Sequence, residues 1–258
     1  MVAGTHWPAG VRAAFTTRNG GVSAPPFSSW NLGDHVGDAP DAVTENRRRL
    51  AERLHARPVF LQQVHGCDVL PVTVDAADQS VADACWTSEP GVACTVMVAD
   101  CLPLLFSTAD GTSVAAVHAG WRGLVGWGGI GVIESLCRDW PGAQLPAQRE
   151  HVQVWLGPCI GPTAFEVGED VRSAFIEHDP NAARHFQPQG SSAGPKYLCN
   201  LPALARDRLA RLGITAIHGN DGSEPWCTVS NPSLFFSHRR DAAHLGSTGR
   251  MAACIWRV

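Results

Sequence analysis

The sequence lacks the features of a secreted, membrane-embedded or nucleic-acid-binding protein. Its first residues contain no charged start followed by a long apolar core and a small-residue cleavage site, so we expect no secretory signal. No apolar run approaches the length of a membrane span. The formal net charge is −4 and the Lys and Arg residues are scattered, which leaves no basic stripe for a nucleic-acid backbone. We therefore expect neither a membrane nor a nucleic acid as a partner.

The nine cysteines form no CxxC pair and are spread singly along the chain. An odd number of isolated cysteines argues against a disulfide framework and for reduced thiols. Together with the missing signal, this pattern predicts a cytoplasmic protein.

The 258 residues contain no internal repeat, no block of charge and no Gly/Ser linker long enough to divide domains. One domain spanning 1–258 is the simplest prediction. The loop-forming stretch at 19–38 is dense in Gly, Pro, Ser, Asn and Asp and precedes a predicted helix through NRRRLAERL. A second surface loop is expected at 187–196.

Apolar, β-branched runs punctuated by Gly, Asp or Pro predict strands, and several are apolar throughout, as expected for strands buried on both faces. Helical patterns alternate irregularly with them, so the class is mixed α and β. The expected strands are 59–66, 69–74, 92–101, 102–107, 112–120, 152–156, 214–219 and 250–258, and the further expected helices are 124–140, 167–178 and 200–213.

Three of these apolar runs end on a histidine or a cysteine: QVHG at His65, VADC at Cys101 and AVHAGWRG at His118. Two imidazoles and a thiolate suit zinc or copper, and three protein ligands leave a fourth position free, as a catalytic zinc site requires. Their spacing is unlike that of a compact zinc finger. Each residue alone would more often be structural, but ends of strands are favoured positions for functional residues. We predict that His65, Cys101 and His118 form a catalytic metal site.

The same segments resemble the YfiH family, also called the laccase-domain, polyphenol-oxidase or peptidoglycan-editing-factor family. The resemblance covers nearly the whole chain. It is carried by QVHG, ADCLPLL and HAGWRG and, in addition, by TTRNGGVS, NL at Asn31, NRRRL, GPCIGP, CT at Cys227, FFSHRR and TGR at Thr248. The resemblance implies an α+β fold of one domain, layered α/β/β/α, with two mixed sheets between helices.

The resemblance also implies a zinc-dependent purine nucleoside phosphorylase acting on adenosine, inosine, guanosine and methylthioadenosine, with adenosine deaminase activity. The substrates would be a purine nucleoside and phosphate, and the protein a monomer or homodimer. The HxE and PCxxC signature of cytidine-type zinc deaminases is absent, so deamination would need another general base.

Two alternatives stay open at this point. One is a hydrolase that removes an amino acid from a peptidoglycan precursor, with zinc or with Cys101 as a nucleophile and His118 as its base. The other is a copper-dependent polyphenol oxidase. No HxH pair occurs, and Met97 and Met251 are the only internal methionines that could serve as an axial copper ligand.

Arg47 and Asn31 fit the family pattern near the site, and Arg is a bidentate partner for phosphate or carboxylate. We predict both as substrate-binding residues. Asp100, beside Cys101, is a candidate to orient a ligand histidine, with a turn-capping role as the alternative.

The remaining candidates have a structural and a functional interpretation. We expect Arg122 and Cys159 to be structural. The FFSHRR segment could form a basic rim for an anionic substrate through His238, Arg239 and Arg240, or a solvated edge.

Overall fold

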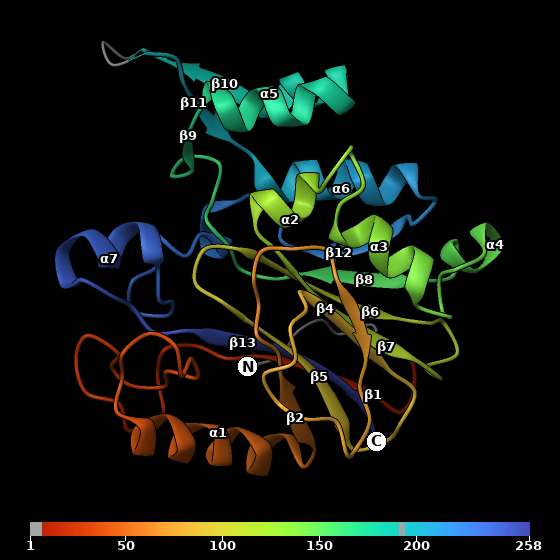
Figure 1. Ribbon diagram of the computed structural model, residues 1–258, viewed down its shortest axis with the longest axis vertical. Coiled ribbons are helices and arrows are strands. Elements are labelled where there is room, and N and C mark those ends of the chain that lie inside the picture. The colour runs from red at the N-terminus through yellow and green to blue at the C-terminus, as the bar shows by residue number, and fades with distance from the viewer. Residues whose placement is uncertain (1–6, 191–193) are drawn as a thin grey trace.

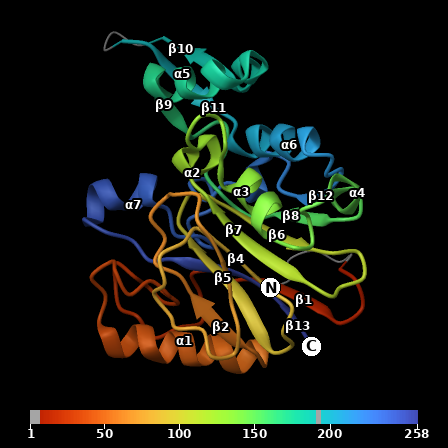
Figure 2. The same ribbon diagram turned by 45° about the vertical axis from the view of Figure 1, so that its right-hand side comes forward.

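A computed structural model describes residues 7–190 and 194–258. Two β-sheets lie face to face, and helices cover the outer face of each (Figure 1). This is the layered α/β/β/α arrangement of mixed sheets that the family resemblance implies. The turned view in Figure 2 shows the same order of layers.

The four-stranded sheet has the order β1-β13-β5-β2. β13 pairs antiparallel with both β1 and β5, whereas β2 runs parallel to β5. The strands are β1 (Val11–Phe15), β2 (Arg57–Phe60), β5 (Val92–Val98) and β13 (Met251–Arg257).

The six-stranded sheet has the order β12-β8-β6-β7-β4-β3. Its central pairs are antiparallel, and the two outer pairs, β12 with β8 and β3 with β4, are parallel. The strands are β3 (Val69–Pro71), β4 (Ala84–Thr87), β6 (Leu102–Ser107), β7 (Val114–Ala119), β8 (Gln153–Leu156) and β12 (Ala216–Gly219).

Every residue of β5, β6 and β7 is buried, because each strand has an apolar neighbour on both faces. On β5, Val96 faces the other sheet, and Met97 faces α1 (Pro40–Leu54). On β6, Leu105 faces the other sheet, and Leu104 packs beneath the helices of the opposite layer. Successive side chains of these strands point alternately to the other sheet and to the helices, and both surroundings are apolar. This explains why the segments are apolar at every position.

The outer face of the six-stranded sheet packs against α2, α3 and α6, as Figure 1 shows. The helices on this side of the molecule are α2 (Trp121–Val125), α3 (Val132–Asp139), α4 (Pro146–Arg149) and α6 (Leu201–Arg211). The side chain of Asn200 accepts a hydrogen bond from the Ala203 amide, so α6 starts as expected near residue 200.

The expectation of one helix over 124–140 is wrong. α2 ends at Val125 and α3 begins at Val132, because Gly126, Gly128 and Gly129 adopt positive φ angles that a helix does not contain. At Gly126 the close approach of the Ile130 carbonyl leaves no room for a Cβ atom.

A third, three-stranded sheet, β10-β11-β9, lies with α5 at one end of the molecule and was not anticipated. The stretch 187–196, expected to be a loop, contributes to two of its strands; residues 191–193 lie outside the described residues. The elements are β9 (Glu166–Gly168), α5 (Glu169–His178), a 3-10 turn (Pro180–His185), β10 (Phe186–Gln189) and β11 (Lys196–Cys199).

The C-terminal part contains a 3-10 turn (Glu224–Trp226) and α7 (His238–Leu245) before β13. All nine cysteines are described and all are free thiols, as expected. Among the described helices, none combines the length and the apolar character that crossing a bilayer demands.

Candidate metal centre and cavity

His65 and Cys101 lie on connections between the two sheets, and His118 lies in a strand of the six-stranded sheet. His118 lies within β7, and Cys101 lies between β5 and β6. His65 was expected at the end of a strand, but β2 ends at Phe60, and the chain then turns away with a φ of 60° at His65. The imidazole of His65 is thus presented by a loop rather than by a strand.

The structure brings the three predicted side chains together. Their nearest ligand atoms all lie within 4.8 Å of one another, and Cys101 Sγ is 3.6 Å from His65 Nε2. The two imidazole rings meet edge to face at a centroid distance of 4.8 Å. His118 and Cys101 are shielded from solvent more than His65, which is exposed. The cluster is therefore accessible from one side.

The residue that orients the histidines is Asp83, which the sequence interpretation missed. Its buried carboxylate accepts a hydrogen bond from His118 Nδ1 at 2.7 Å. It also accepts bonds from the backbone amides of Val64, His65 and Gly66 at 2.7 to 3.1 Å. Burial alone would raise the pKa of Asp83, but the hydrogen bond and charge of His118 and these amides lower it.

Asp100 does not orient a ligand histidine, contrary to one interpretation of the sequence. Its carboxylate accepts hydrogen bonds from Thr228 Oγ1 at 2.5 Å, Ser237 Oγ at 3.1 Å and the Arg239 amide at 2.7 Å. Asp100 has a φ of 89° and immediately precedes Cys101. Its role is to anchor the turn that carries the cysteine.

Gly120 provides the space that the cluster needs. A Cβ atom at this position would lie 2.6 Å from His65 Cδ2 and 3.1 Å from Cys101 Sγ. Gly123 serves the neighbouring turn, where a Cβ atom would lie 2.9 Å from the Gly66 carbonyl oxygen. The two glycines of HAGWRG thus allow α2 to approach the His65 loop.

Cys101 and His118 favour the charged forms of each other. Burial alone would raise the pKa of the Cys101 thiol, but the charge of His118 and hydrogen bonds from His118 and His65 lower it to about 6. Burial alone would lower the pKa of His118, but the Cys101 and Asp83 anions raise it to about 9. A thiolate is the form in which cysteine binds metal or acts as a nucleophile.

The donor set fits a zinc or copper ion. It consists of one thiolate-forming sulfur and two imidazoles, and Asp83 on Nδ1 leaves Nε2 of His118 as its ligand atom. Three donors on one side leave a coordination position directed toward solvent or substrate. The described residues near the cluster supply no fourth His, Cys, Asp or Glu ligand.

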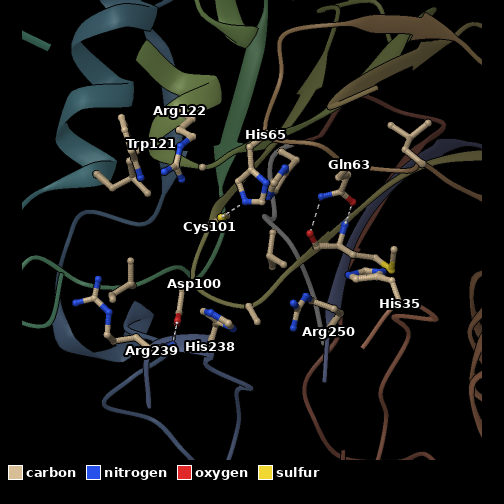
Figure 3. Close-up of a pocket in the computed structure, with 18 of the residues that line it drawn as sticks. His35, Gln63, His65, Asp100, Cys101, Trp121, Arg122, His238, Arg239 and Arg250 are labelled. Carbon is tan, nitrogen blue, oxygen red and sulfur yellow. Dashed lines mark hydrogen bonds between the residues drawn. The ribbon is translucent and has the colours of Figure 1, made fainter. Parts of the chain in front are cut away.

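The cluster lies in the wall of a cavity of about 740 Å³, a size that accommodates a small organic molecule (Figure 3). Trp121 and Phe165 contribute aromatic surface. Gln63, two residues before His65, also lines the cavity and binds both the amide and the carbonyl of Met97 through its side chain. This pair of bonds ties the His65 loop to the end of β5.

Three arginines line the cavity: Arg122, Arg239 and Arg250. Asp100 is the carboxylate among the lining residues, and its hydrogen bonds to three donors already satisfy it. The cavity therefore has a positive character that favours an anionic ligand. Arg122, expected to be structural, stacks on Trp121 at 4.5 Å and also reaches the cavity.

Neither Arg47 nor Asn31 lines the cavity. Arg47 donates to the Leu32 carbonyl, forms an ion pair with Asp34 at 3.2 Å and stacks on Phe60 at 4.0 Å. Asn31 is fully buried, and its side chain bonds within its own loop and to the backbone amide of Arg250. The structure thus brings together His65, Cys101 and His118 but leaves these two predicted substrate ligands outside the cavity wall.

The basic rim expected from FFSHRR divides into two parts. His238 and Arg239 line the cavity. Arg240 instead binds Asp241 and the carbonyls of Thr228, Val229 and Phe235, which makes it a structural residue.

Cys159 is fully buried and forms an isolated β-bridge with Cys227. Its sulfur accepts a hydrogen bond from Asn220 Nδ2 at 3.4 Å. These contacts agree with a structural residue.

Comparisons with known proteins cover nearly the whole chain. A purine nucleoside phosphorylase of Pseudomonas aeruginosa is 49% identical over 96% of this chain and 94% of its own length. The purine nucleoside phosphorylase YfiH of Escherichia coli is 48% identical over 97% and 96%. The crystal structure of protein NMB0706 of Neisseria meningitidis, assigned to DUF152, superposes with a TM-score of 0.87 at 41% identity, over 100% of this chain and 98% of that one.

The family model described as "Multi-copper polyphenol oxidoreductase laccase" matches residues 12–258. With the relatives above, this match agrees with the resemblance drawn from QVHG, ADCLPLL and HAGWRG. The chain therefore belongs to the laccase-domain family, YfiH/DUF152.

Proposed function

We propose that this protein is a zinc-dependent purine nucleoside phosphorylase of the cytoplasm. The observation that carries the proposal is the position of the His65, Cys101 and His118 cluster in the wall of a cavity that three arginines also line. Relatives with nearly half of their residues identical bear the name purine nucleoside phosphorylase. The free thiols agree with a reducing compartment.

Phosphorolysis joins a phosphate oxygen to C1′ of the ribose and breaks the bond between C1′ and the purine nitrogen. The electron pair of that bond leaves with the base, which takes up a proton. The site must therefore bind an anion beside a neutral nucleoside and keep water from attacking in its place. Guanidinium groups of the cavity wall suit the first task, and the apolar and aromatic side chains beside them suit the second.

The aromatic faces of Trp121 and Phe165 offer apolar surface to a purine ring. Asp83, Gln63 and Gly120 hold the cluster in one geometry, so little rearrangement is needed on binding. Zinc, when bound by His65, Cys101 and His118, would supply Lewis-acid stabilisation of negative charge.

The test is release of purine base from inosine, guanosine, methylthioadenosine and adenosine with and without inorganic phosphate. We expect base and ribose 1-phosphate in equal amounts, and only with phosphate. With adenosine, adenine reports phosphorolysis and inosine reports deamination. Base release that ignores phosphate would replace phosphorolysis with hydrolysis. With no base release, the family's other names direct the assays to amino-acid release from a peptidoglycan precursor and to phenol oxidation.

Elemental analysis of freshly purified, chelator-free protein tests the metal. We expect about one zinc per chain, because two imidazoles and one thiolate form a zinc site under reducing conditions. Copper in place of zinc would favour the oxidase. Less than about a tenth of an equivalent of either metal would remove the metal from the proposal and leave Cys101 as a candidate nucleophile.

A further inference from the structure

Arg250 is the arginine of the cavity wall that the fold holds most firmly. Its backbone amide donates to Asn31 Oδ1 at 2.8 Å. Its side-chain stem packs on Gly33, where an added Cβ atom would lie 2.7 Å from Arg250 Cγ. The NL motif of the long loop and the TGR motif before β13 are thus in direct contact. This contact fixes the direction in which Arg250 enters the cavity.

The guanidinium of Arg250 keeps one edge free. Nη1 donates to the carbonyls of Thr248 and Gly249 at 3.0 and 3.3 Å. Within residues 7–190 and 194–258, Nε and Nη2 have no hydrogen-bond acceptor and no carboxylate lies within ion-pair distance. Nε and Nη2 form one planar edge, which matches two oxygens of a phosphate group.

The other arginines near the cavity are either bound to protein groups or more exposed to solvent. Arg47 is paired with Asp34 and stacked on Phe60, and Arg240 is held by Asp241 and three carbonyls. Arg122 and Arg239 line the cavity but are exposed, and they rest on Trp121 and Phe165. Arg250 is less exposed than either of them, so its electrostatic attraction to a bound anion would be stronger.

Figure 3 shows Arg250 on the wall across from His65, with Cys101 and Asp100 to the other side of the opening. We propose that the free edge of Arg250 binds the phosphate that attacks the nucleoside. The assignment rests on the proposed phosphorylase function. Under this assignment Arg250, which lines the cavity, binds phosphate in place of Arg47. Asn31 then positions the backbone of Arg250 and does not contact substrate.

The first test compares the Michaelis constants of Arg250→Ala, Arg250→Gln and Arg250→Lys with those of the wild-type protein. We expect Arg250→Ala and Arg250→Gln to raise the constant for phosphate about ten- to a hundredfold and the constant for nucleoside less than about threefold, because charge-assisted hydrogen bonds are lost. Arg250→Lys should recover only part of the loss, because an ammonium lacks the planar fork.

The second test needs no turnover. Inorganic phosphate without nucleoside should raise the melting temperature of the wild-type protein, and this rise should be lost in Arg250→Gln. Arg12→Ala, an exposed arginine of β1, is the matched control and should keep the full rise. Arg47→Ala tests the rival assignment and should also keep it.

The outcomes separate the assignment from the proposed function. Nucleoside turnover that needs no phosphate would overturn the phosphorylase, whatever the variants do. Phosphate-dependent turnover with equal rises in both constants for Arg250→Gln, or an unchanged phosphate-induced rise in melting temperature, would overturn the role of Arg250. A larger effect on the phosphate constant from Arg47→Ala than from Arg250→Gln would return the contact to Arg47.

Discussion

The Asp83 carboxylate binds His118 through Nδ1 at 2.7 Å and, at the same time, caps the three backbone amides that begin at Val64. One buried side chain therefore fixes the ring orientation of His118 and the backbone conformation of the loop that carries His65. Carboxylates bonded to ligand imidazoles orient the ring and increase its basicity, and they influence metal affinity strongly.

Asp83→Asn should weaken zinc binding about ten- to a hundredfold, because the amide lacks the negative charge and can accept fewer of the four hydrogen bonds. Competition with a chromogenic chelator measures the dissociation constant. Asp75→Asn, in an exposed turn, is the matched control. An unchanged dissociation constant in a folded Asp83→Asn protein would assign Asp83 to the fold alone.

Cys101 should be the cysteine that alkylating reagents modify first in zinc-stripped protein. Its pKa is lowered to about 6, so the thiolate forms as the pH rises through 6, and the alkylation rate should climb from pH 5 to about 7 and then level off. Burial raises the pKa of Cys137 to about 11 and also raises that of Cys67. Peptide mass mapping after brief iodoacetamide treatment identifies the labelled thiol, and zinc should protect it. A midpoint near 9 for Cys101 would contradict the thiolate–imidazolium pair.

Cys101→Ala should abolish activity without unfolding the protein, since the side chain is only partly buried and packs at the edge of a hydrophobic core. Cys137→Ala, Cys159→Ala and Cys227→Ala should keep nearly full activity. Thermal unfolding measured beside each assay separates loss of function from loss of fold. A folded but inactive Cys159→Ala protein would contradict the interpretation of Cys159 as a structural residue.

Gly120→Ala should lower zinc affinity about five- to a hundredfold, because overpacking of this size costs about 1–3 kcal/mol. The added methyl group would push against His65 Cδ2 and Cys101 Sγ. Gly190→Ala introduces the same methyl group where no atom of the described residues lies within 4 Å. Chelator competition measures the zinc dissociation constant of both variants. Equal constants would mean that the His65 loop shifts to accommodate the methyl group without loss of zinc affinity.

Arg208→Met should destabilise the protein by about 3 kcal/mol, because it leaves Glu134 and two carbonyls without their buried partner. Arg208 is 5% exposed and binds Glu134 at 3.0 Å and the Gly129 carbonyl at 2.5 Å, which ties α6 to the turn between α2 and α3. Urea unfolding gives the free energy. The exposed pair of Arg138 with Asp139 is the control, and Arg138→Ala should cost less than about 1 kcal/mol.

The buried strands of the core could be predicted from local composition, whereas the layered arrangement was implied by the resemblance to the YfiH family. Runs such as Val92–Val98 and Leu102–Ser107 are apolar at every position, and only a strand covered on both faces makes use of that pattern. The His65, Cys101 and His118 cluster could be predicted because its residue types are those of a metal site and each follows or ends an apolar run.

The residues that support the cluster could not be placed in the same way, because their partners are distant in sequence. Asp83 stands 35 positions from His118, and Arg250 stands 219 from Asn31. One signal for Asp83 was present: a carboxylate between small apolar residues in VADAC must find hydrogen-bond donors if it is buried. Nothing local distinguishes Arg250 from Arg47, since only the fold decides which guanidinium is already paired.

Two of the three candidate donors lie where the chain passes from one sheet to the other. Between β2 and β3 it crosses through His65, and between β5 and β6 it crosses through Cys101, while His118 belongs to β7. An ion bound by all three would link the two layers. At a free ion concentration of a hundred times its dissociation constant, it would raise the free energy of unfolding by about 2.7 kcal/mol. Removal of the ion would then lower the free energy of unfolding, and amide exchange at both crossings should accelerate first.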